Sequence, residues 1–185
     1  TNAEIVTGPL LTLIKKSLKK TNLINYPKFF ERTYKENIRR VNWAATNNVF
    51  LKYSVIRKHK LIFDKNLNKI GFGEDQLFFS KLNKYGYKIY WSKNVKVFEN
   101  IDLYRLNLNW LIKRSFRVGI VGYYIDVNIY GRYVGFIVNY LKCIYYFTKV
   151  FSLFFLFFNG KSRVQILNYF SRCYGRLIGP LVLGK

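Results

Sequence analysis

Acidic residues are scarce in this sequence. Nine Asp and Glu stand against 32 Lys and Arg, which gives a formal net charge of +23 over 185 residues. Half of the residues are hydrophobic and 19% are aromatic, so the composition excludes a disordered polybasic tail. A folded chain with this charge should associate with something anionic, such as nucleic acid, a membrane surface or a phosphorylated substrate.

Residues that bind metals or form disulfides are also few. The chain has one His and two Cys. Cys143 and Cys173 form no CxxC motif, and His59 does not stand at a spacing that would complete a zinc site with them. Both cysteines lie in apolar surroundings, so we expect buried, reduced thiols in a protein that faces the cytoplasm. The alternative is a disulfide between them.

Methionine is absent, and the chain begins at Thr1. A complete translated chain normally starts with Met, so we expect a piece of a longer protein whose N-terminal part is missing. The lack of a signal peptide at Thr1 therefore does not indicate where the protein is located.

The most informative stretch is residues 71–86, which hold the only adjacent pair of acidic residues, Glu74 and Asp75. Apolar side chains follow the pair with helical spacing, and Gly86 stands where a helix C-terminus favours positive φ. We therefore predict a short helix with both carboxylates in its first turn, where the helix dipole favours negative charge. One interpretation is that the pair only caps the helix. The other is that it carries chemistry.

The remaining elements are predicted from apolar periodicity and turn residues. We expect a turn at Asn47–Asn48, because Asn side chains bond to nearby backbone. The other predicted elements are a helix over residues 10–18, a short helix over 53–59, strands over 87–91 and 95–99, and a helix over 106–118 that precedes two glycines.

The C-terminal third is dominated by an apolar segment, residues 133–158. Its length suits a membrane span, but Asn139, Lys142 and Lys149 fall on one narrow helical stripe. That pattern favours an amphipathic helix in the membrane interface, with Lys reaching the lipid phosphates. Residues 161–176 repeat the pattern. The alternatives are a true span and packing of both helices on the domain core.

Several segments resemble the C-terminal half of the GT-A family 2 glycosyltransferases, an inverting group that builds bacterial polysaccharides and glycolipids. Residues 73–91, GEDQLFFSKLNKYGYKIYW, match the pattern G-E-D-x-x-F-x-x-R-L-x-x-x-G-x-x-I-x-W, with Lys for Arg. Residues 46–52 resemble G-x-N-x-x-x-R, residues 63–64 resemble F-D-E, and residues 114–119 resemble R-x-F-R-x-G.

The resemblance implies an α/β fold: the acceptor-side half of a GT-A Rossmann-like domain over residues 1–120. Residues 121–185 are then a membrane-associated tail of amphipathic, interfacial helices. The nucleotide-binding strands of the family would precede Thr1. We therefore expect this chain to be inactive by itself, and the longer protein to lie at the cytoplasmic face of the cell membrane, peripheral or monotopic.

The resemblance also implies an enzyme that transfers a sugar from a nucleotide-sugar to a saccharide or lipid-linked acceptor. Asp75 is then the general base and Glu74 orients the acceptor. Asn47, Asn48 and Trp91 are candidates for acceptor binding, with core packing as the alternative for Trp91. Arg114 and Arg117 are candidates for the donor phosphates, since Arg offers bidentate donors. A basic face against anionic lipid is the alternative for both.

Two departures from the family pattern concern a metal. The Asp-x-Asp motif that would hold Mg or Mn in the full-length enzyme is absent from this chain. Many members carry a His after the second strand, whereas this chain has Glu99 there. A carboxylate can bind Mg or Mn, so Glu99 is a candidate ligand, with a surface Glu as the alternative.

Two non-enzymatic functions remain as alternatives. One is a basic membrane-surface protein, in which Glu74 and Asp75 are only caps. The other is a nucleic-acid-binding module, which the charge and the many Tyr and Phe permit. The aromatic residues cluster in long apolar segments and no nucleic-acid-binding signature is present, so nucleic acid is the less favoured partner.

Overall fold

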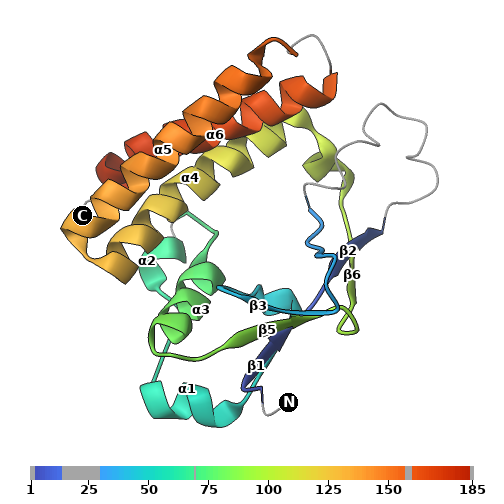
Figure 1. Cartoon of the computed structure of the whole chain (residues 1–185), viewed down its shortest axis with the longest axis vertical. Helices are drawn as coiled ribbons and strands as arrows, with labels where there is room; N and C mark the ends of the chain where they lie inside the picture. The colour runs from blue at the N-terminus through green and yellow to red at the C-terminus, as the bar shows by residue number, and fades with distance from the viewer. Residues whose placement is uncertain (1–2, 14–29, 69, 157–159, 184–185) are drawn as a thin grey trace. The chain divides into compact units, whose positions relative to one another are not determined.

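The computed structural model describes residues 3–13, 30–68, 70–156 and 160–183, and it is a mixed α/β structure. The chain forms two compact units (Figure 1). The first contains residues 1–64 and 74–106, and the second contains residues 65–73 and 107–185. We expected a division after residue 120, but that position lies within a long helix that begins at Leu108.

A four-stranded sheet forms the centre of the first unit. Its order is β3-β5-β1-β4, in which β1 and β5 run parallel and the two outer pairs run antiparallel. The strands are β1 (Ile5–Thr7), β3 (Ile38–Val41), β4 (Val49–Leu51) and β5 (Ile89–Ser92). The strand predicted over residues 87–91 is thus confirmed, with its start two residues later.

The core of this unit lies where the sheet meets α3 (Glu74–Lys84). Ile5 and Ile89 are paired across β1 and β5, and both are completely buried. From α3, Phe78, Phe79 and Leu82 join the same cluster. Burying side chains of this size is the main force that holds a small unit together. The helix predicted after the acidic pair is confirmed, and Gly86 follows it with φ +93°.

The prediction of a helix over residues 10–18 is wrong for its first part. Leu10–Leu13 form β2, which pairs in parallel with β6 (Val97–Asn100). Residues 14–18 lie outside the described residues. The local pattern of Leu and Lys favours a helix, but pairing with β6 supplies backbone hydrogen bonds that the sequence alone does not reveal.

Short helical elements complete the first unit and begin the second. The predicted turn at Asn47–Asn48 is a 3₁₀ turn, η4 (Thr46–Asn48), and the predicted helix over residues 53–59 is α1 (Tyr53–His59). A second 3₁₀ turn, η5 (Leu103–Leu106), closes the first unit. In the second unit, α2 (Lys65–Asn68) precedes the long helices.

Three long helices make up most of the second unit and pack side by side on one another (Figure 1). They are α4 (Leu108–Tyr130), α5 (Arg132–Phe154) and α6 (Gly160–Leu183). The predicted helix over residues 106–118 continues for three further turns. Gly119 lies within α4. A Cβ at this position would overlap the Arg172 carbonyl of α6, so glycine allows the two helix backbones to approach closely.

The polar stripe of α5 does not face outward as we expected. Asn139 is buried, and Lys142 contacts Asp126 of α4, so this part of the stripe packs against the neighbouring helices. No helix in the described part of the chain has both the length and the apolarity that crossing a bilayer would require.

Candidate functional site

The acidic pair lies in the first turn of α3, directly after Gly73 at φ +96°. The Oδ1 atom of Asp75 accepts a hydrogen bond from the backbone N–H of Gln76 at 2.7 Å. The backbone of Thr46 donates a second hydrogen bond to the same carboxylate. The first unit therefore brings the acidic pair and the start of η4 together, although they are far apart in the sequence.

Burial raises the pKa of Asp75 above its ordinary value. The hydrogen bond from Gln76 opposes this change, the neighbouring charge of Glu74 adds to it, and the bond from Thr46 again opposes it. The net result is a carboxylate that binds a proton more readily than an exposed one. A general base requires this property, because its pKa must approach the operating pH.

Asn48 holds the turn beside Asp75 in place. Its side chain is buried and its Nδ2 donates to the carbonyls of Pro9 at 2.9 Å and Val95 at 3.0 Å. The Thr7 hydroxyl donates to the Asn48 carbonyl at 2.6 Å. The amide of Asn48 is thus occupied by protein partners, whereas Asn47 is exposed and remains the candidate of this pair for acceptor binding.

The candidate Trp91 and the other tryptophan of the first unit, Trp43, are both packed against protein. Trp91 is 0% exposed and meets the Tyr34 ring edge-on at 5.2 Å between centroids. The guanidinium of Arg32 lies 4.1 Å from the centroid of the half-buried Trp43 ring. The burial of Trp91 favours core packing, the alternative that we gave for it, over stacking on an acceptor sugar.

Glu99 is already paired. Its carboxylate lies 2.7 Å from the guanidinium of Arg105. Across the part of the chain that the structure describes, no three His, Cys, Asp or Glu side chains converge as a metal site requires. The described residues, Glu99 included, therefore do not fit a Mg or Mn ion.

Arg114 and Arg117, the candidates for binding donor phosphates, belong to α4 in the second unit. Arg114 lies over the rings of Trp110 and Phe72, at 5.4 Å and 5.8 Å from their centroids. The side chains of Arg114 and Arg117 are both half-buried. Their expected role thus rests on a different unit from the one that carries Glu74, Asp75, Asn47 and Asn48.

The structure adds a cavity that the sequence did not suggest. It has a volume of about 420 Å³ and is lined by Glu31, Arg32, Thr33 and Tyr34. Arg32 also donates to the carbonyl of Trp43 at 3.0 Å, which joins the cavity wall to the loop between β3 and η4. The mixture of basic and aromatic residues around Arg32 was the available signal, but no motif or periodicity distinguished it.

Comparison with known proteins finds no match: no protein-family model fits the chain, and no curated protein and no solved structure is similar to it.

Proposed function

We propose that the first unit is the acceptor side of a sugar-transfer site, in the acceptor-side half of a GT-A type glycosyltransferase. Asp75 is the general base. The observation that carries the proposal is a half-buried carboxylate with a raised pKa in the first turn of α3, held by backbone hydrogen bonds from Gln76 and Thr46. The resemblance of residues 73–91 to the family 2 glycosyltransferase motif implies the reaction class.

In the proposed reaction, an acceptor hydroxyl attacks the anomeric carbon of a nucleotide-sugar. The new bond joins the acceptor oxygen to that carbon, and the bond between the carbon and the phosphate oxygen breaks. Asp75 takes the hydroxyl proton as the bond forms, and a nucleoside diphosphate leaves. Glu74 and the exposed Asn47 orient the acceptor.

The capping role does not compete with this proposal. The Gln76 N–H occupies Oδ1 of Asp75, as a stabilising residue at a helix start requires. A residue selected only for that role gains nothing from burial beside a second carboxylate. The raised pKa therefore favours a chemical role for Asp75.

The test is a sugar-transfer assay with the full-length protein. Nucleoside diphosphate release is measured for a panel of nucleotide-sugars with a lipid-linked saccharide acceptor, for the wild type and Asp75→Asn. The variant keeps an oxygen that accepts from Gln76 but cannot act as a base. We expect the rate to fall by about 10²- to 10⁴-fold.

The matched control is Asp102→Asn, the same chemical change at an exposed position. It should keep the wild-type rate. If Asp75→Asn is folded by circular dichroism and releases the diphosphate as fast as the control, then Asp75 is a helix cap and not the base.

A further inference from the structure

The helix α5 turns its apolar side chains outward. Its large residues Phe136, Ile137, Tyr140, Leu141, Phe147 and Phe151, which we call the outer face of α5, are all more than half exposed. On α6, Phe170, Tyr174, Leu177 and Leu181 are exposed in the same way. Apolar surface of this extent is unusual on a soluble monomer and marks a surface that another phase or molecule covers.

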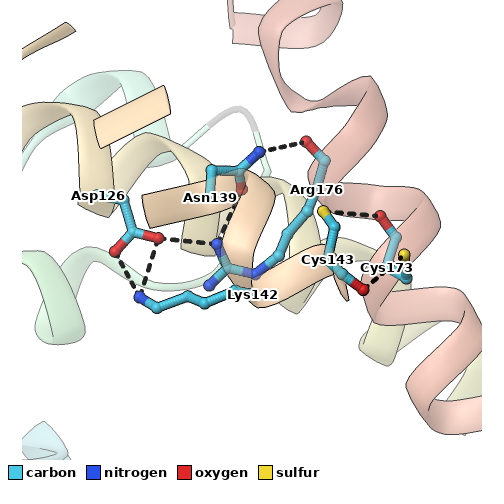
Figure 2. A network of polar contacts seen from close by, with 6 residues as sticks. All are labelled: Asp126, Asn139, Lys142, Cys143, Cys173 and Arg176. Atoms are coloured by element: carbon cyan, nitrogen blue, oxygen red, sulfur yellow. Dashed lines mark hydrogen bonds and ion pairs between the residues drawn. The ribbon is translucent and has the colours of Figure 1, made fainter. Parts of the chain in front are cut away.

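The opposite side of α5 is polar and faces its neighbours. Figure 2 shows Asp126 of α4 between two cations, Lys142 of α5 and Arg176 of α6. The distances from the Asp126 carboxylate are 2.7 Å to Lys142 and 2.8 Å to Arg176. Asn139 accepts from the Arg176 guanidinium at 2.9 Å. Three helices thus share one polar cluster, with Asp126 and Arg176 both more than nine-tenths buried.

Beside aromatic pairs such as Phe116 and Tyr174, these helices make further contacts through polar groups and glycines. The Ser115 hydroxyl of α4 donates to Asn168 of α6 at 2.5 Å. Gly119 of α4 and Gly175 of α6 face each other so closely that a Cβ on either would overlap the other helix. Helices in lipid associate through small residues and interhelical hydrogen bonds, because apolar side chains gain nothing by leaving the acyl chains.

Charge decides what covers this surface. No Asp or Glu follows Asp126 in the sequence, whereas Arg132, Lys149 and Arg163 are exposed on α5 and α6. Two copies of such a surface repel each other at close approach. An anionic bilayer instead attracts these side chains, and long basic side chains reach its phosphates while their helix lies among apolar groups.

We propose that the second unit docks into an anionic lipid bilayer through the outer face of α5 and the exposed apolar side chains of α6. The helices lie in the interface with these side chains among the acyl chains. The cluster of Asp126, Asn139, Lys142 and Arg176 keeps the polar groups of the three helices paired inside the protein. This proposal does not depend on the sugar-transfer proposal.

The test is flotation of the full chain with vesicles of equal parts phosphatidylglycerol and phosphatidylcholine. The variant is Phe147→Gln with Phe151→Gln, whose side chains are 65% and 66% exposed. We expect a partition coefficient that is about a hundredfold lower, because each Phe loses the free energy of leaving water. The matched control is Phe50→Gln with Phe98→Gln, at 68% and 57% exposure in the first unit, and it should float as the wild type does.

Salt separates insertion from charge attraction alone. At about 1 M NaCl exposed charges are largely screened. Wild type that still floats supports insertion of the apolar side chains, and complete loss of binding overturns it. Equal flotation of the two double variants also overturns the proposal. If the wild type is a dimer that the α5 variant dissociates while flotation is unchanged, the surface contacts a second copy instead.

A second variant keeps the proposal testable if the double variant fails to fold. Phe151→Trp preserves the apolar character of the position and adds a fluorophore. Vesicles that carry bromine on the acyl chains should quench the additional Trp emission, compared with wild-type protein in the same vesicles. Additional emission that is insensitive to the bromine contradicts insertion of α5.

Discussion

Two opposing effects act on the charged form of Asp75. Its hydrogen bonds favour the charged form, and burial disfavours that form more strongly, so its pKa is raised in the folded state. A raised carboxyl pKa means that the folded state binds the proton more tightly than the unfolded state. Protonated Asp75 therefore stabilises the fold fully below the ordinary carboxyl pKa. This stabilisation is lost as the pH rises through the raised pKa of the folded state.

The stability of Asp75→Asn follows from this sign. The amide keeps an acceptor for the Gln76 N–H but carries no charge, so the variant should have the higher free energy of unfolding at about pH 7, and the difference should shrink toward about pH 4. Urea unfolding at both pH values measures it, with Asp102→Asn as the exposed control. A variant that is less stable than the wild type at neutral pH would show that the hydrogen bonds to the charged carboxylate outweigh its burial.

Asn48 should have the larger effect on folding. Asn48→Ala removes one of the two donors to the Pro9 carbonyl, which keeps the Val97 N–H, and also removes the amide donor to the carbonyl of the half-buried Val95. We therefore expect it to lower the free energy of unfolding by about 1–3 kcal/mol. Asn47→Ala is the adjacent control, and its exposed side chain should contribute little. Denaturant unfolding compares the two. Equal stabilities would mean that the two carbonyls find other donors when the amide is absent.

At the scale of the elements, the carboxylate of Asp126 in α4 forms ion pairs with both α5 and α6. Asp126→Asn removes the charge that neutralises the buried Arg176 and contacts Lys142. Breaking a buried ion pair from one side typically costs about 3–5 kcal/mol, because the other charge stays buried. We therefore expect this variant to lose its helical circular dichroism signal at a lower temperature than the wild type.

Asp102→Asn is again the control for the loss of an acidic charge, since its side chain is exposed. Unchanged melting of Asp126→Asn would assign the stability of the three helices to their apolar and glycine contacts rather than to the polar cluster.

The orientation of α5 shows what a sequence pattern does and does not determine. The spacing of Asn139 and Lys142 predicted one polar side of the helix, and the structure has it. The pattern does not determine what that side contacts, because Lys and Asn can form hydrogen bonds with water, with lipid phosphates or with a buried Asp. Asp126 stands on another helix, so its pairing with Lys142 and Arg176 depends on tertiary contacts.

At the scale of the whole molecule, local signals predicted the elements and missed the long-range pairings. The helix after Glu74 and the turn at Asn47–Asn48 were predicted from neighbouring residues, and both are confirmed. Leu10–Leu13 become a strand only because β6 lies beside them. The proximity of Thr46 to Asp75, and the burial that raises the pKa of Asp75, likewise arise from the folded first unit.

The charge of the molecule is distributed unevenly along the chain. Every acidic residue lies at or before Asp126, so the residues that follow are basic or neutral. This distribution agrees with both proposals: a general base in the first unit, and docking of the second unit on an anionic bilayer. Eight of the nine acidic residues belong to the first unit, and Asp126 belongs to the second.

The pH dependence of kcat/KM for sugar transfer tests the central claim most directly. A general base must be deprotonated, so the rate of the wild type should fall as the pH drops through the raised pKa of Asp75, above the usual carboxyl value of about 3.9. In Asp75→Asn the residual rate should lack this acid limb. An acid limb at the same pH in both proteins would contradict the assignment of Asp75 as the base.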